Sequence, residues 1–139
     1  MLSTIAFTKI CNQLGKPLVD LFATNYTAQC KKFVSWFPCP FAANVDAFSI
    51  EWNEFFYAFP PFSLIARVLK KIRSEKCRGI VVAPKWPTQP WYPDFMAMKK
   101  SKVLFFGPTA NLIFSPFSSS PNPLNKTLIL MAAILSGDL

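Results

Sequence analysis

The chain has 139 residues, enough for one domain, and 52% of them are hydrophobic, which excludes an intrinsically disordered chain. Lys and Arg number 15 against 7 Asp and Glu, and the formal charge of +8 favours an acidic partner, nucleic acid in the simplest case, over an inert basic surface. The four cysteines show no Cys-x-x-Cys spacing and there is no histidine, which excludes nearly every zinc site and the Ser-His-Asp and Cys-His catalytic sets.

The apolar stretches of the sequence are short. The first fifteen residues lack the long apolar block and the small-residue cleavage site of a signal peptide. The run Leu128–Leu135 is far too short to span a bilayer. We therefore expect an intracellular protein, nuclear or cytoplasmic, with reduced thiols and with no membrane or metal partner.

The first part of the chain alternates helix and strand patterns. Apolar residues at helical spacing predict a helix over Leu2–Leu14, closed by Gly15. Leu18–Ala23 reads as a short buried strand that contains one carboxylate, Asp20. The elements expected next are a short helix over Thr27–Lys32, a strand over Lys32–Trp36, and a strand or strand-end loop over Val45–Phe48.

The segment Phe55–Phe62 is the most informative stretch. It is an apolar run that ends in Pro60-Pro61, directly before a helical pattern. A diproline cannot continue a strand ladder, and it fixes two successive backbone angles. Such a segment is typical of a loop at the carboxyl edge of an open α/β sheet, where ligands bind.

The helix that follows the diproline has an apolar face and a basic face. Its apolar residues are Leu64, Ile65, Val68, Leu69 and Ile72. Residues of the basic face are candidate phosphate contacts, although such a face is most often just solvated. These candidates are Arg67, Lys70, Lys71, Arg73 and, just after the helix, Arg78.

The apolar run Gly79–Ala83 then predicts a central parallel strand covered on both faces, and we expect it to neighbour the strand Phe55–Ala58. Strand, helix and strand recur, so the sequence predicts a single-domain α/β fold with a mostly parallel sheet. Three parts are expected: an N-terminal helix and lead-in (1–17), the α/β domain (18–106), and an irregular segment with a C-terminal helix (107–139). The later elements expected are a short helix over Pro90–Met98, a strand over Lys102–Phe106, a short strand at Leu112–Phe114 and a helix over about Asn125–Leu135.

Several short motifs follow one another in a fixed order. The series comprises Asp20-Leu21-Phe22-Ala23, Asp46-Ala47-Phe48 with Trp52, Tyr57-Ala58-Phe59-Pro60-Pro61-Phe62, and Trp86-Pro87-Thr88-Gln89-Pro90-Trp91. Over nearly the whole chain it resembles the segment that follows the reverse transcriptase and ribonuclease H domains in polyproteins of DIRS-type (tyrosine-recombinase) retrotransposons. More distantly, it is similar to phage-type DNA adenine-N6 methyltransferases. The resemblance implies a three-layer, Rossmann-like methyltransferase-type fold for the α/β domain.

The resemblance also assigns candidate site residues. An Asp-x-x-Ala motif that helps to hold S-adenosylmethionine corresponds to Asp20, Phe22 and Ala23. An acidic element that faces the adenine of the cofactor corresponds to Asp46, Ala47 and Phe48. The place of the Asn-Pro-Pro-Tyr motif that grips the target base is taken by Phe59, Pro60, Pro61 and Phe62.

The chemistry of these positions argues against methyl transfer. The family's Asn or Asp accepts an N–H of the poorly nucleophilic adenine amine, whereas the Phe59 side chain has no acceptor. Phe62 still offers a ring on which a flipped base can stack. The turn Ala23–Tyr26 lacks the glycine with which nucleotide-binding turns approach their ligand. We therefore expect no bound cofactor, S-adenosylmethionine being the one that the resemblance allows.

Together these features predict a catalytically degenerate methyltransferase-like domain that binds DNA or RNA and contacts neighbouring domains of a retroelement polyprotein. One alternative is an active S-adenosylmethionine-dependent enzyme. Another is a structural docking module beside the reverse transcriptase and ribonuclease H. Plainer interpretations also stand: Asp20 as a structural cap or ion-pair partner, Asp46 as a turn residue, and Trp86, Trp91 and Tyr92 as core packing.

Overall fold

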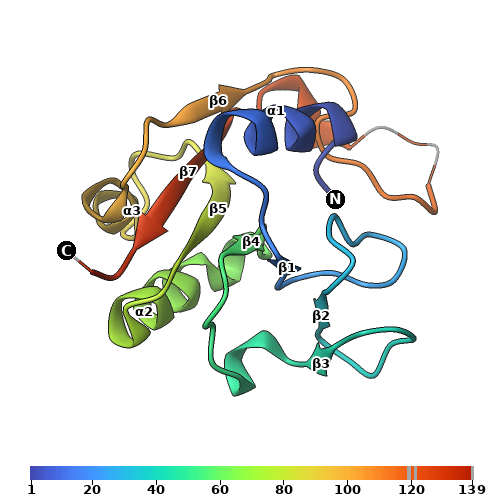
Figure 1. Cartoon of the computed structure of the whole chain (residues 1–139). Helices are drawn as coiled ribbons and strands as arrows, with labels where there is room; N and C mark the ends of the chain where they lie inside the picture. The colour runs from blue at the N-terminus through green and yellow to red at the C-terminus, as the bar shows by residue number, and fades with distance from the viewer. Residues whose placement is uncertain (119, 121, 139) are drawn as a thin grey trace.

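The computed structural model describes residues 1–118, 120 and 122–138. Within them a five-stranded sheet has the strand order β1-β4-β5-β7-β6, as Figure 1 shows. Strands β1, β4 and β5 pair in parallel, and β7 pairs antiparallel with both β5 and β6, so that β7 alone runs against the other four described strands of this sheet. The strands are β1 (Val19–Asp20), β4 (Phe56–Ala58), β5 (Arg78–Pro84), β6 (Leu104–Phe106) and β7 (Leu130–Ser136).

A small parallel pair continues the sheet beyond β1. It consists of β2 (Val34–Ser35) and β3 (Asn44–Val45). A parallel bridge joins Asp20 to Phe33, and the amide N–H of Ala23 donates to the carbonyl of Val34 at 3.1 Å. Across the molecule the strands therefore follow one another as β3-β2-β1-β4-β5-β7-β6.

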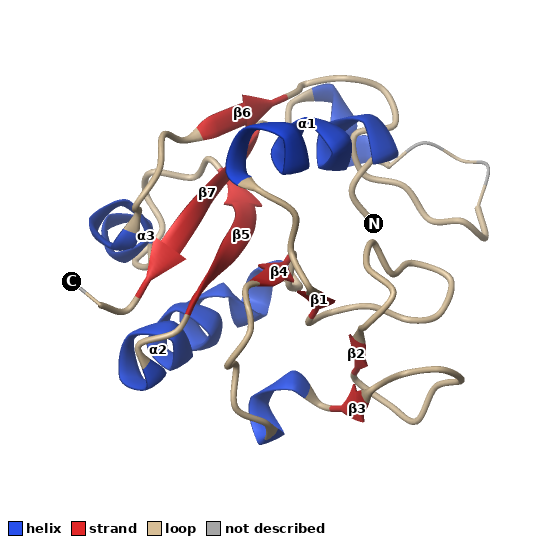
Figure 2. Ribbon diagram, viewed as in Figure 1, coloured by secondary structure: helices blue, strands red, loops and turns tan. Residues whose placement is uncertain are grey.

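Helices cover both faces of the sheet (Figure 2). α2 (Ile65–Glu75) and α3 (Tyr92–Met98) pack on one face, with Phe56 and Ala58. α1 (Thr4–Leu14) packs on the other face, with Tyr57. This alternation follows from the pleat of the strand, which points successive side chains to opposite faces. The 3₁₀ turns η1 (Ala47–Ser49), η2 (Phe62–Leu64) and η3 (Pro123–Lys126) lie in the connections.

The sequence predicts much of this framework correctly. A single α/β domain is confirmed, and β4 and β5 are neighbours joined by the amphipathic helix α2. The apolar face of α2 is buried as expected, at Ile65, Val68, Leu69 and Ile72. Each fully buried side chain of this size contributes roughly 1.5–3 kcal/mol. Gly15 closes α1 with φ 104°, a conformation that glycine adopts readily.

The expected C-terminal helix over Asn125–Leu135 is wrong, because the segment begins in η3 and its residues from Leu130 onward form β7. Leu130–Leu135 is a continuous apolar run, and such a run does not by itself distinguish a buried strand from a buried helix. Pairing on both sides decides the matter, since β7 lies between β5 and β6. Within the expected part 107–139, Leu130–Ser136 thus belongs to the sheet, and Ser119, Pro121 and Leu139 lie outside the described residues.

Two further expectations fail locally. The helix expected over Thr27–Lys32 is replaced by turns, in which the Thr27 hydroxyl accepts from the Thr24 amide at 2.9 Å and the Gln29 amide donates to Asp20. Threonine competes in this way with helical hydrogen bonding. The strand expected at Leu112–Phe114 reduces to a single bridge between Ile113 and Leu2 in the described structure.

Candidate functional site

The most suggestive site lies where β1 and β4 end side by side. The chain leaves β1 toward β2 and leaves β4 toward β5 on the opposite side, so strand order reverses between these two strands. Open α/β sheets bind ligands at such a switch point, outside the carboxyl ends of the strands. A hollow of about 380 Å³ lies here, and we call it the carboxyl-edge crevice. Its lining includes Asp20, Phe22, Thr27, Gln29, Tyr57, Phe59, Pro60, Pro61 and Phe62.

Asp20 provides the acidic group of the crevice. Its side chain is 2% exposed, and its carboxylate accepts backbone N–H bonds from Phe22 at 3.2 Å and Gln29 at 3.0 Å. Within the described part of the chain it forms no ion pair with a Lys or Arg side chain. Burial raises the pKa of Asp20 to about 7, even though the two N–H bonds lower it. The carboxyl group therefore changes protonation state near neutral pH.

Tyr57 lies beside Asp20 in the pairing of β1 with β4. Its ring contacts Phe7 edge-on, with centroids 4.9 Å apart. Its hydroxyl is buried and has no hydrogen-bond partner among the described residues. Burial, and next the charge of Asp20, raise the pKa of Tyr57 well above its ordinary value. A buried polar group without a partner costs about 1–3 kcal/mol, so this hydroxyl is a candidate ligand contact.

The diproline corner forms an aromatic wall. The Phe62 ring lies 6.3 Å from the Phe59 ring and 5.1 Å from the Trp86 ring, measured between centroids. Pro60 is buried and Phe59 half-buried. The corner thus offers apolar surface to the crevice, and the Phe59 side chain offers no hydrogen-bond acceptor. Trp91 is buried in the core, which favours core packing for that residue over a stacking platform.

A second hollow of about 400 Å³ adjoins the crevice at the ends of β1 and β2. The two hollows share Phe22, Thr27 and Pro61. The second is also lined by Ala23, Thr24, Trp36, Phe37, Ala47, Ser63 and Leu64. Each hollow lies within the size range of small-molecule sites, roughly 300–1,000 Å³.

Two expected cofactor residues are absent from the lining of both hollows. Asp46 has φ 62° and caps η1, where its carboxylate accepts from the Phe48 amide at 3.0 Å. This is the role of a turn residue. The Phe48 ring packs against Phe22 and carries the Arg67 guanidinium at 4.0 Å from its centroid. The structure therefore places Asp20, Phe22, Ala23 and Ala47 in the linings of the two adjoining hollows. Asp46 instead caps the turn η1, and Phe48 of that turn packs against Phe22.

The basic residues after the diproline lie outside the crevice lining. Lys71 pairs with Glu75, and Arg73 lies 3.5 Å from Asp94. The guanidinium of Arg78 lies 5.9 Å from the centroid of the Phe55 ring, at the opposite end of the sheet from the crevice. Lys70 is exposed on α2. As α2 returns from the carboxyl end of β4 to the start of β5, its basic side chains spread away from the switch point.

Sequence reasoning did not single out Tyr57 or Trp36 as site residues. The available signal for Tyr57 was a hydroxyl within an otherwise apolar strand, because a buried Tyr hydroxyl needs a partner. For Trp36 the sequence offered only its place at a strand end. Trp36 is 60% exposed, and this exposure depends on the tertiary structure and cannot be predicted from a local sequence pattern.

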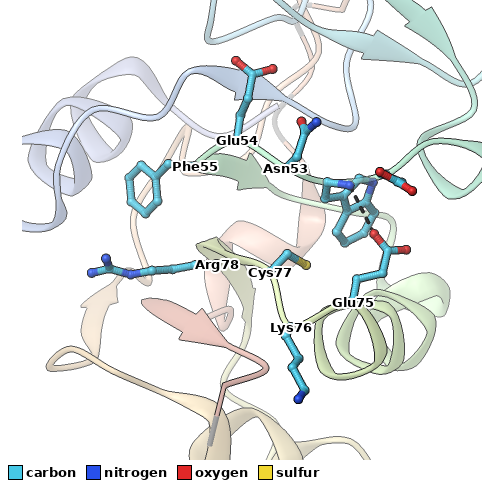
Figure 3. Close-up of a pocket in the computed structure, with 9 residues that line it drawn as sticks. Asn53, Glu54, Phe55, Glu75, Lys76, Cys77 and Arg78 are labelled. Atoms are coloured by element: carbon cyan, nitrogen blue, oxygen red, sulfur yellow. Dashed lines mark hydrogen bonds between the residues drawn. The ribbon is translucent and has the colours of Figure 1, made fainter.

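A wider hollow of about 810 Å³ opens at the amino ends of β4 and β5 (Figure 3). It is lined by Glu51–Phe55 and Glu75–Arg78. Two of its three glutamates are engaged: Glu54 pairs with Lys32, and Glu75 pairs with Lys71 and accepts from the Trp52 amide at 3.2 Å. Since ligands bind at the other end of parallel strands, we do not regard it as the main site.

Other kinds of site receive no support. Among the described residues, no group of three or more His, Cys, Asp or Glu side chains is placed to hold a metal ion. No described helix combines the length and apolarity needed to cross a membrane. No protein-family model matches the chain, and no curated protein is significantly similar to it.

Proposed function

We propose that this chain is a nucleic-acid-binding domain with a three-layer Rossmann-like fold of the methyltransferase type, derived from a DIRS-type retrotransposon polyprotein and no longer able to transfer methyl groups. The proposal combines the motif order of the sequence with the geometry at the strand ends. Neighbouring polyprotein domains are its expected partners besides DNA or RNA.

The strand order supports the fold part of the proposal. The doubly wound dinucleotide fold has the order 3-2-1-4-5-6. Here the order is the same when read through the bridge between Asp20 and Phe33, with one antiparallel strand, β7, inserted between β5 and β6. Helices on both faces of the sheet agree with it.

One observation carries the functional part. Asp20 from β1 and the corner Phe59–Phe62 from β4 are distant in sequence, yet they line the same crevice at the switch point. The methyltransferase resemblance assigns the first to the cofactor and the second to the target base, so it requires that they meet. Convergence of these residues is the arrangement that an enzyme of this type, or its descendant, needs.

Two features of the crevice argue for lost catalysis. A base amine in the crevice would find no side-chain acceptor at Phe59, and an unpaired N–H in a dry site costs about 1–3 kcal/mol. The turn after β1 runs through Ala23, Thr24 and Asn25 without glycine. Aromatic rings for stacking remain in place, at Phe62 and Phe22.

An active S-adenosylmethionine-dependent adenine methyltransferase is the second candidate. The specific observation in its favour is the pair of adjoining hollows of about 380 and 400 Å³, which would suit a donor molecule beside an extruded base. Asp20, Phe22, Ala23 and Ala47 are the residues that would contact the donor.

Cofactor titration and methyl transfer separate the two candidates. We expect no saturable binding of S-adenosylmethionine by calorimetry and no transfer of labelled methyl groups to single- or double-stranded DNA, but oligonucleotide binding that weakens with salt. Methylation that Asp20→Asn abolishes and Glu51→Gln retains would establish the active enzyme instead. If no oligonucleotide binds even at low salt, the nucleic-acid function fails and a docking role toward neighbouring polyprotein domains becomes the better account.

A further inference from the structure

Five aromatic side chains from three loops are strongly exposed, and we call them the aromatic rim; two of them line the hollow at the ends of β1 and β2. The five side chains are Tyr26, Trp36, Phe37, Phe41 and Phe117, exposed by 64%, 60%, 53%, 89% and 74%. An exposed aromatic here and there is ordinary, but a cluster around a hollow marks a binding surface.

The rim comes from three loops, which follow β1, β2 and β6, and the first of them contacts the other two. The loop after β1 carries Tyr26, whose ring lies 4.9 Å from that of Phe117. The same loop meets the loop after β2, because the Cys39 thiol donates to the Asn25 side chain at 3.1 Å and accepts from the Asn25 amide at 3.4 Å. In Figure 1 these three loops lie on the same side of the molecule, toward the right of the view.

The rim adjoins the proposed site directly. Trp36 and Phe37 also line the hollow at the ends of β1 and β2, which shares Phe22 and Pro61 with the carboxyl-edge crevice. A chain molecule that lies across the rim would therefore pass the mouth of the crevice.

Folding alone does not account for Phe41. Its φ of 67° lies in the left-handed region, which is unfavourable for a bulky residue. Its ring is 89% exposed, so packing within the chain does not compensate for that conformation. Strained, exposed positions of this kind are found at binding and switch regions.

The charge distribution favours an anionic partner at the rim. Residues 21–45, which carry four of the five rim side chains, contain no Asp or Glu, and their two lysines are Lys31 and Lys32, of which Lys32 pairs with Glu54. Residues 108–137, which carry Phe117, contain Lys126 and again no Asp or Glu. The glutamates of the chain lie elsewhere: Glu51, Glu54 and Glu75 all line the hollow at the other end of the sheet.

We propose that the aromatic rim binds single-stranded nucleic acid, whose bases stack on Tyr26, Trp36 and their neighbours while lysines face the phosphates. The proposal rests on the proposed function and names its surface and its ligand class. Unpaired bases expose the ring faces that stacking requires, whereas a duplex buries them. The binding surface is thus the rim rather than the basic side of α2.

Fluorescence anisotropy with a labelled oligothymidylate strand, and with a duplex of equal length, tests the rim. We expect the wild-type chain to prefer the single strand, and Trp36→Ala and Tyr26→Ala each to weaken it by about tenfold. Phe105→Ala is the matched control, since Phe105 is 53% exposed on β6 and is expected to leave the affinity unchanged. Binding should also quench tryptophan fluorescence, and this quenching should be smaller in the Trp36 variant.

The outcomes separate the inference from the function beneath it. If oligonucleotide binding is unchanged in both rim variants, or is as strong for the duplex as for the single strand, the rim is not a single-strand binding surface. The proposed nucleic-acid function would then still hold. Absence of any binding by the wild-type chain at low salt overturns both. If a polyprotein fragment binds at the rim and the oligonucleotide does not compete with it, the rim is a protein-docking surface. This result also contradicts the inference.

Discussion

The two ends of the sheet are built differently. At the carboxyl edge, Asp20 is buried without a Lys or Arg partner in the described structure, and the Tyr57 hydroxyl has no hydrogen bond there. At the amino edge, Glu54 and Glu75 pair with lysines, and Glu75 also accepts from the Trp52 amide at 3.2 Å. The buried hydroxyl without a partner thus lies at the carboxyl edge, where a ligand could supply the missing hydrogen bond. The contrast supports our proposal that the carboxyl edge is the functional end.

The largest effect on stability is expected from the ionisation of Asp20. The folded-state pKa of about 7 lies above the ordinary value of 3.8, so the native state binds the proton more tightly than the unfolded state. This contribution to stability is fully present below pH 4 and is lost as pH rises through 7. Urea unfolding should therefore show a free energy of unfolding about 3 kcal/mol lower at pH 8 than at pH 5.

Asp20→Asn is the control for that pH dependence. Asn does not titrate, so the dependence between pH 5 and pH 8 should nearly disappear, although one of the two backbone N–H acceptors is lost. An equally steep dependence in this variant would assign the titration to another group and weaken the account of the crevice.

Gly79→Ala should destabilise the amino edge without a specific effect on ligands. A Cβ at Gly79 would lie about 2.4 Å from atoms of the Phe56 ring, which is fully buried and has little room to move. Overpacking of this kind costs about 2 kcal/mol. Urea unfolding measures the loss, with Ser74→Ala on the exposed side of α2 as the neutral control. Nucleic-acid affinity of the folded fraction should stay unchanged, and a selective loss of affinity would contradict the division between the two ends.

Tyr57→Phe should stabilise the fold, in contrast to the destabilising Gly79→Ala. Removing a buried hydroxyl without a partner should raise the free energy of unfolding by about 1 kcal/mol. If a ligand completes that hydroxyl, the same substitution should weaken nucleic-acid binding, as is typical of functional positions. Thermal denaturation and anisotropy on one sample test both parts. A clear loss of stability would show that the hydroxyl already has a partner.

The smallest effect on stability is expected from replacing Lys70 and Lys71 with Gln. Surface substitutions of this kind change stability by less than about 0.5 kcal/mol. If these residues contact phosphates, the slope of log affinity against log salt should become shallower by about 2. Because α2 leads away from the rim, we expect a weaker change of slope than that. A slope that becomes shallower by the full amount of about 2 would show that the basic side of α2, rather than the rim, binds the phosphates.

The sequence was sufficient to predict the elements with a regular signal. The apolar face of α2, the strand around Ile80–Ala83 and the carboxylate in β1 each follow from local patterns. The meeting of Asp20 with Phe59–Phe62 was also expected, because carboxyl ends of parallel strands share an edge.

The remaining features depend on contacts that the sequence does not state. The sequence predicts a helix where β7 forms, because a short apolar run is ambiguous until its partners are known. Asp46 carries the same residue type as Asp20, yet one caps a turn and the other lines the crevice. The aromatic rim was missed because its side chains come from three loops that meet only in the folded chain.

The most direct test of the functional carboxyl edge is the amide NMR spectrum of the chain during titration with an oligothymidylate strand. We predict that shift changes concentrate at Ala23–Tyr26, Trp36–Phe37, Phe59 and Phe62, with little change at Glu51–Phe55 and Cys77–Arg78. Changes concentrated at the amino-edge residues, or no changes while affinity is measurable by anisotropy, would contradict this assignment.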